Sequence, residues 1–78
     1  MKILLVEDDA TTIDYIVKGF LEQGHNIETA SDGHQGLSLA TSSQYDLVIL
    51  DRMLPQLDGL KLLAALRATG NQTPVLIL

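Results

Sequence analysis

Four acidic residues stand directly after the two most hydrophobic segments in the interior of the chain. Glu7, Asp8 and Asp9 follow the run ILLV. Asp51 follows the run DLVIL. Neighbouring carboxylates repel one another, and their burial adds a cost of desolvation. Several charged oxygen ligands suit a hard cation such as Mg²⁺, and an aspartate beside such a cation can attack a phosphoryl group. The pattern therefore indicates a cation site, with Asp51 as the candidate nucleophile.

The elements that must position these residues follow from alternating apolar runs and helical patterns. Strands are expected at 3–6, 26–30, 46–50 and 74–78. Helices between successive strands predict a parallel α/β sheet covered on both faces. Ligands of such sheets bind beyond the carboxyl ends of the strands. If the first and third strands are neighbours, as their high hydrophobicity favours, Glu7, Asp8 and Asp51 meet at one edge.

The predicted helices have recognisable ends and apolar stripes. Gly24 and Gly70 are expected to end the first and third helices. Asp9 is expected at the start of the first helix, where the helix dipole favours an acid. Ser31 or Asp32 should begin the second. The stripe of the first helix is Ile13, Ile16, Val17, Phe20 and Leu21. The stripe of the third, which should begin at Asp58–Gly59, is Leu60, Leu63, Ala64 and Leu66.

The composition suits one globular domain. Of the 78 residues, 46% are hydrophobic and 19% are charged, unlike a disordered tail. The net charge of −5 argues against a nucleic-acid surface, because phosphate binding needs clustered Lys and Arg. The chain has no cysteine and therefore no thiol chemistry. No apolar run reaches the roughly 20 residues of a membrane span, and Glu7 interrupts the first run too early for a signal peptide. A cytoplasmic protein is expected.

Three motifs resemble the receiver domain of two-component response regulators. They are VEDD at 6–9, DLVILD at 46–51 and DRMLPQLDG at 51–59. The last matches the family pattern D-x-x-M/L-P-x-M/L-D-G at every defined position, and the resemblance runs over the whole chain. It implies a flavodoxin-like doubly wound sheet of strand order 2-1-3-4-5. The acidic motif and the Leu-Pro loop are most similar to receivers joined to winged-helix transcription factors.

The resemblance also implies a role for each site residue. Asp51 would accept a phosphoryl group from a histidine kinase and would bind Mg²⁺. Asp8 would be a direct Mg²⁺ ligand, Met53 would offer its backbone carbonyl, and Glu7 would act through a metal-bound water. The residues expected to shape the loop are Pro55, Asp58 and Gly59. Such a domain is not an enzyme beyond self-catalysed phosphotransfer and dephosphorylation, and its output would be transcription through a DNA-binding domain not present here.

Complete receivers have a fifth strand, and this chain is expected to be a partial receiver domain, 1–78, in the order β-α-β-α-β-α-β. The Ser or Thr and the Lys that complete the family's site are absent from it. We therefore expect weak Mg²⁺ binding and poor phosphoryl acceptance. The edge of the last strand, Val75–Leu78, would expose unpaired backbone groups and apolar side chains. Self-association through that edge is expected.

Other functions fit the sequence less well. Phosphatases that form an aspartyl-phosphate use D-x-D after the first strand, and Ala10 breaks that pattern. No G-x-G-x-x-G follows the first strand, which excludes a dinucleotide site of that type. An interaction module that keeps the receiver fold but works without phosphorylation stays open as an alternative.

Overall fold

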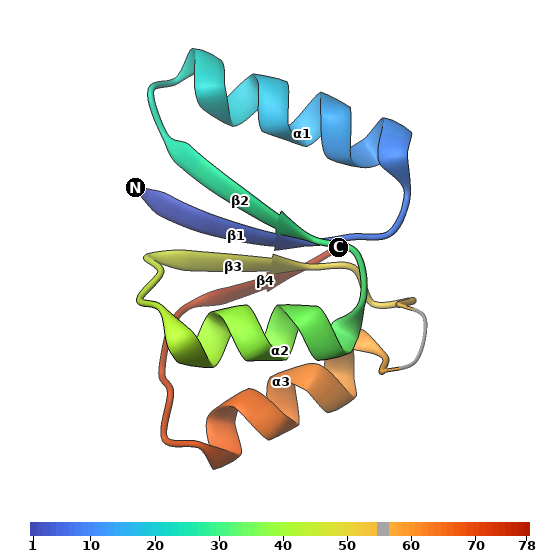
Figure 1. Cartoon of the computed structure of the whole chain (residues 1–78), viewed down its shortest axis with the longest axis vertical. Helices are drawn as coiled ribbons and strands as arrows, with labels where there is room; N and C mark the ends of the chain where they lie inside the picture. The colour runs from blue at the N-terminus through green and yellow to red at the C-terminus, as the bar shows by residue number, and fades with distance from the viewer. Residues whose placement is uncertain (55–56) are drawn as a thin grey trace.

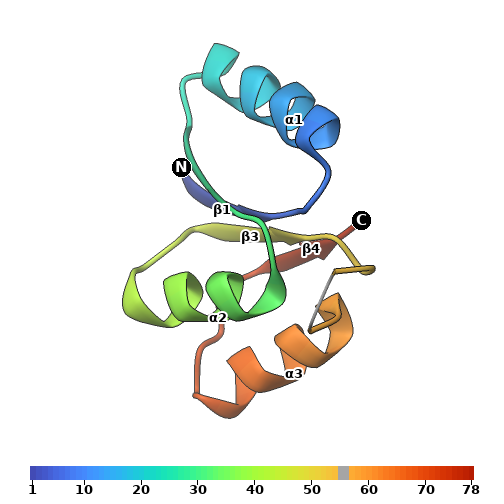
Figure 2. The same ribbon diagram turned by 45° about the vertical axis from the view of Figure 1, so that its right-hand side comes forward.

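The computed structural model describes residues 1–54 and 57–78. The strands are β1 (Lys2–Val6), β2 (Asn26–Ala30), β3 (Leu47–Leu50) and β4 (Val75–Ile77). The helices are α1 (Ala10–Glu22), α2 (Gly33–Ser42) and α3 (Gly59–Ala68). Helix α1 covers one face of the sheet, while α2 and α3 cover the other (Figures 1 and 2). The predicted β-α-β-α-β-α-β order is confirmed.

All strand pairs are parallel, and the order across the sheet is β2-β1-β3-β4. The two hydrophobic strands β1 and β3 are therefore neighbours at the centre, as predicted, and the half-polar β2 lies at an edge. In their shared register, Val6 stands opposite Leu50. Strand β4 forms the other edge of the described sheet, and Leu76 on it is 52% exposed. Self-association through this edge stays a prediction.

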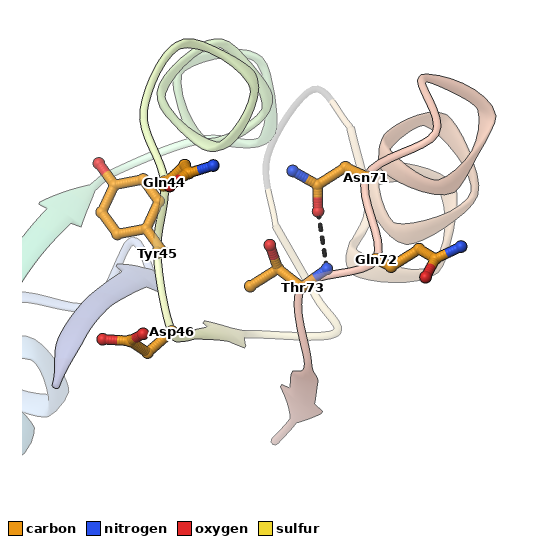
Figure 3. A pocket seen from close by; sticks show the side chains of 6 residues that line it. All are labelled: Gln44, Tyr45, Asp46, Asn71, Gln72 and Thr73. Atoms are coloured by element: carbon orange, nitrogen blue, oxygen red, sulfur yellow. Dashed lines mark hydrogen bonds between the residues drawn. The ribbon is translucent and has the colours of Figure 1, made fainter.

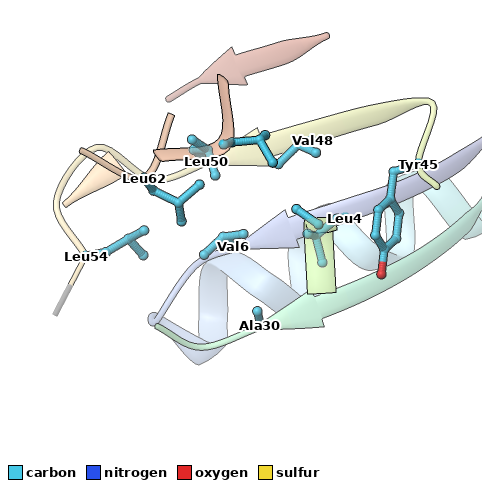
Figure 4. Packing of buried hydrophobic residues seen from close by; sticks show 10 residues of the cluster. Leu4, Val6, Ala30, Tyr45, Val48, Leu50, Leu54 and Leu62 are labelled. Carbon is cyan, nitrogen blue, oxygen red and sulfur yellow. The ribbon is translucent and has the colours of Figure 1, made fainter. Parts of the chain in front are cut away.

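Two hydrophobic layers hold the helices to the sheet. Successive side chains of a strand point to opposite faces, so Leu4 and Val6 face α2 and α3, while Ile3 and Leu5 face α1. Figure 4 shows Leu4 and Val6 in the layer between the sheet and α2 and α3, which also includes Leu62 of α3. All these side chains are fully buried. Both central strands therefore have apolar runs without a polar face, because neither face meets water.

Each helix begins at an aspartate whose carboxylate accepts a hydrogen bond from the main chain three residues on. The cap–donor pairs are Asp9–Thr12 (2.9 Å), Asp32–Gln35 (2.8 Å) and Asp58–Lys61 (2.9 Å). Gly24 and Gly70 follow α1 and α3 with φ of 80° and 86°, which a residue with a side chain rarely adopts. These predicted starts and ends are confirmed.

The predicted helix stripes are partly wrong. On α1, Leu21 is 56% exposed, whereas the apolar pattern predicts it on the buried stripe. On α3, Leu60 is 47% exposed, whereas Leu62, which the predicted stripe omits, is fully buried. The segment LKLLAAL is apolar on most of its circumference, so periodicity does not identify the face that meets the sheet. No helix in the described ranges is long and apolar enough to span a membrane.

The corrected face of α3 can be tested by comparing two leucines. Replacing fully buried Leu62 by alanine removes apolar contacts and leaves a cavity, so Leu62→Ala should destabilise the fold by about 2–5 kcal/mol. Leu60→Ala on the exposed face should change stability by no more than about 0.5 kcal/mol. Urea unfolding followed by circular dichroism measures both. Equal losses in the two variants would contradict the observed orientation of α3.

Candidate metal centre

The ladder of backbone hydrogen bonds that joins β1 to its two neighbours continues one residue past the strand ends. It places Glu7 and Asp51 side by side. The Glu7 N–H donates to the carbonyl oxygen of Ala30 (3.0 Å), and the Asp51 N–H donates to that of Val6 (2.9 Å). Because Val6 pairs with Leu50, the next residue of each strand leaves the sheet at the same edge. The backbone of both acids is thus fixed by the sheet itself.

Glu7, Asp8 and Asp51 come together at this edge. One carboxylate oxygen from each can be chosen so that all three lie within 4.8 Å of one another. Glu7 is only 5% exposed, Asp51 is half-buried and Asp8 is exposed. The group therefore runs from the interior to the surface, and a small ion can reach it from solvent. The donor set, three carboxylates and no nitrogen or sulfur, fits a hard divalent cation such as Mg²⁺.

Without a bound cation, the three carboxylates of this group repel one another. The pKa of Glu7 is raised from 4.5 to about 7, first by burial and then by hydrogen bonding to, and repulsion from, the adjacent carboxyl of Asp51. Within residues 1–54 and 57–78, the one ion pair joins Lys2 and Glu28, well away from this edge. No basic side chain of the described residues pairs with these three carboxylates. A bound divalent cation would offset the repulsion among them.

The turn after Asp51 is held against its carboxylate. The Met53 N–H donates to Asp51 Oδ1 (3.0 Å), which fixes the rotation of that carboxylate. The Met53 side chain itself is 80% exposed, so the part of this residue that meets the site is its main chain. Pro55, which was expected to shape the loop, lies outside the described residues.

The loop returns to β3 at Gly59. Its N–H donates to the carbonyl oxygen of Arg52 (3.1 Å), and a Cβ at this position would lie 2.5 Å from the carbonyl oxygen of Asp51. Only glycine allows this approach without a shift of the backbone. Asp58, the residue before it, caps α3 and lies outside the group of three carboxylates. Gly33 packs against the same loop at Leu57, and no motif in the sequence indicates this contact.

A separate cleft of about 520 Å³ lies at the amino ends of β3 and β4 (Figure 3). It is lined by Gln44, Tyr45, Asp46, Asn71, Gln72 and Thr73. Its lining is mainly amide and hydroxyl groups with a single carboxylate, and Asn71 Oδ1 accepts a hydrogen bond from the Thr73 N–H (2.9 Å). The cleft is thus at the end of the strands opposite the clustered acids and does not have the ligand set of a cation site.

The sequence model of the response regulator receiver domain matches residues 3–78. The chain belongs to this family. The transcriptional regulatory protein HprR of Escherichia coli is 49% identical over 78 residues, 100% of this chain and 34% of HprR. PcoR of Escherichia coli, also a transcriptional regulatory protein, is 46% identical over 77 residues, 99% of this chain and 34% of PcoR. The chain therefore spans about a third of the length of these relatives.

Solved receiver domains have the same fold. The receiver domain of Francisella response regulator 1452 gives a TM-score of 0.94 at 38% identity, over 97% of this chain and 63% of that one. The receiver domain of the Pseudomonas aeruginosa sensor histidine kinase PA1611 gives 0.93 at 31% identity, over 97% and 64% of the two chains. That structure has a magnesium ion coordinated in its active site cleft.

The raised pKa of Glu7 predicts an unusual dependence of stability on pH in the absence of divalent cations. A carboxyl whose pKa is higher in the folded chain than in the unfolded one stabilises the fold only while it is protonated. This contribution is complete below pH 4.5 and is lost as the pH rises through about 7. The loss is at most about 3–4 kcal/mol, since one pKa unit corresponds to about 1.4 kcal/mol and the pKa rises from 4.5 to about 7.

Urea unfolding in EDTA at a series of pH values measures this effect. Glu7→Gln should abolish most of the decline between pH 5 and 8, whereas Glu22→Gln, at an exposed acid on α1, should leave it intact. A decline that persists in Glu7→Gln would assign the titration to another group.

Proposed function

We propose that this chain is the phosphoryl-accepting receiver of a two-component response regulator, with all 78 residues part of that domain and Asp51 as the acceptor. The convergence of Glu7, Asp8 and Asp51 at the carboxyl end of the central strands is the observation that carries the proposal. Family membership supports it, because the acids lie in the motifs by which the chain resembles receivers.

In the proposed reaction, a carboxylate oxygen of Asp51 attacks the phosphorus of a phosphohistidine. A P–O bond forms, the P–N bond to the imidazole breaks, and the released imidazole takes up a proton. The Met53 N–H bond to Asp51 Oδ1 orients the nucleophile, and the fixed end of β3 keeps it in place. Positioning of this kind supplies much of the rate of phosphoryl transfer.

Mg²⁺, when bound, supplies the positive charge that neutralises the phosphoryl oxygens. We assign Asp8, Asp51 and the Met53 backbone carbonyl as its protein ligands. Glu7, the most buried of the acids, would act through a metal-bound water. The magnesium in the PA1611 receiver supports this assignment by similarity. The three loop positions Pro55, Asp58 and Gly59 would keep Asp51 and Met53 in register with the ion.

The partners we propose are a sensor histidine kinase, as phosphoryl donor, and DNA bound by another domain of the whole protein. The named relatives are transcriptional regulators and are about three times as long as this chain. We propose a cytoplasmic location because the expected donor and DNA act there. That the chain alone accepts a phosphoryl group poorly stays a prediction.

Magnesium binding can be detected by its effect on stability. At ten times the dissociation constant, Mg²⁺ should stabilise the fold by about 1.4 kcal/mol. Thermal unfolding with and without Mg²⁺ at matched ionic strength should show this rise for the chain and for Asp14→Asn, an exposed acid on α1 used as the control. Asp8→Asn should show little or none. An equal rise in all three would indicate non-specific binding.

Phosphoryl transfer is tested with the whole response regulator and its kinase. Asp51→Asn removes the nucleophile and should abolish incorporation of phosphate from phosphorylated kinase, whereas Asp14→Asn should leave it within about twofold, because that residue lies away from the site. Intact mass and radiolabelled phosphate measure the product. If Asp51→Asn leaves both incorporation and partner binding unchanged, the alternative of a phosphorylation-independent interaction module is favoured.

A further inference from the structure

The amino-terminal end of α2 touches the loop that follows Asp51. Gly33, the first residue of α2, is buried. A Cβ built there would meet the carbonyl oxygen of Leu57 and would lie 2.7 Å from the Leu57 Cβ. The φ of Gly33 is outside the left-handed region, so the absence of a side chain serves the close contact and not the backbone conformation.

A second glycine contact connects this point to the acceptor. Leu57 is two residues before Gly59, and Gly59 lies against the carbonyl of Asp51, where a Cβ would approach to 2.5 Å. Between them, Asp58 caps α3 by accepting from the Lys61 N–H (2.9 Å). The stretch 57–59 is thus confined between α2 on one side and the end of β3 on the other.

We infer that Gly33 is a positioning residue for the metal and phosphoryl site, an inference that rests on the proposed function for its chemical consequence. A methyl group at Gly33 meets a backbone carbonyl, which cannot rotate aside as a side chain does. The loop must therefore move away from α2, and the shift passes through Gly59 to Asp51. Metal and catalytic sites tolerate displacements of only about 0.5 Å, and changes in groups that hold ligands in place typically lower metal affinity 10–100-fold.

Two other glycines of the chain provide matched controls. At Gly36, one turn further along α2, a Cβ would lie 2.7 Å from a methyl group of Val6, so Gly36→Ala disturbs packing on the sheet without touching the loop. At Gly19 of α1 nothing lies within 4 Å of the added Cβ. Gly19→Ala should raise the melting temperature, since alanine favours a helix interior over glycine.

The experiment compares Gly33→Ala, Gly36→Ala and Gly19→Ala by amide NMR and Mg²⁺ titration. In Gly33→Ala, the amide signals of Met53, Gly59 and Lys61 should shift, and the Mg²⁺ dissociation constant should rise about tenfold or more. Gly36→Ala should lower the melting temperature while those three signals and the dissociation constant stay near wild type. Wild-type signals and affinity in Gly33→Ala would overturn the inference, as would equal effects in Gly36→Ala.

The amide signals and the Mg²⁺ dissociation constant together separate this inference from the proposed function. If the wild-type chain shows no Mg²⁺-dependent shifts, the proposed site fails, while displaced loop amides in Gly33→Ala still support the mechanical link. If Gly33→Ala does not fold, Leu57→Gly in the same chain removes the Leu57 Cβ, 2.7 Å from the new methyl group, and gives the Leu57 carbonyl the backbone freedom of glycine to turn away. Leu57→Gly alone is the control for the lost leucine packing. Recovery of folding in the double variant supports the contact as the cause, and a double variant that stays unfolded while Leu57→Gly alone folds overturns it.

Discussion

The pairing of β1 with β3 determines whether the carboxylates meet at all. Side chains alternate along a strand, so a slip of one residue would turn every side chain of one strand to the other face. With Val6 opposite Leu50, both strands bury apolar residues on both faces, and the residue after each strand emerges at the same edge. The register that the core requires therefore also brings Glu7 and Asp51 together, and hydrogen bonds that continue the pairing hold the backbone of both residues.

The same arrangement lowers the stability of the fold when Glu7 is charged. Glu7 lies almost completely buried next to Asp51, and burial together with the Asp51 carboxyl raises its pKa, which disfavours the charged form. A local conflict of this kind in an otherwise consistent fold is typical of functional positions. Glu28, in the middle of the edge strand β2, shows the contrast. Its Oε1 lies 3.8 Å from Lys2 Nζ and accepts a hydrogen bond from the Tyr45 hydroxyl at 2.8 Å.

Much of this structure could be predicted from sequence because the signals are local. Continuous apolar runs marked the two central strands, and Asp58, like the other two caps, stands directly before its helix. The buried face of α3 could not be predicted from periodicity, since Leu60 and Leu62 are equally apolar and only contact with the sheet distinguishes them. The contact of Gly33 with Leu57 joins residues that are distant along the chain, and a lone glycine at the start of a helix gives no sign of it.

Two glycines of α2 bring this helix into close contact with the segments that hold the carboxylates. Gly36 brings α2 close to Val6, one residue before Glu7, and Gly33 brings the same helix against Leu57. One helix therefore contacts both sides of the carboxylate group, the end of β1 and the loop after β3. The two contacts differ in kind, because Gly36 meets side-chain methyl groups of Val6 and Gly33 meets the backbone carbonyl of Leu57. Packed interiors transmit displacement with little compression, so a shift at Gly33 passes into the loop and on to Asp51. Methyl groups at Gly36 can yield by rotation, and the backbone of Glu7 stays held by its hydrogen bond to Ala30.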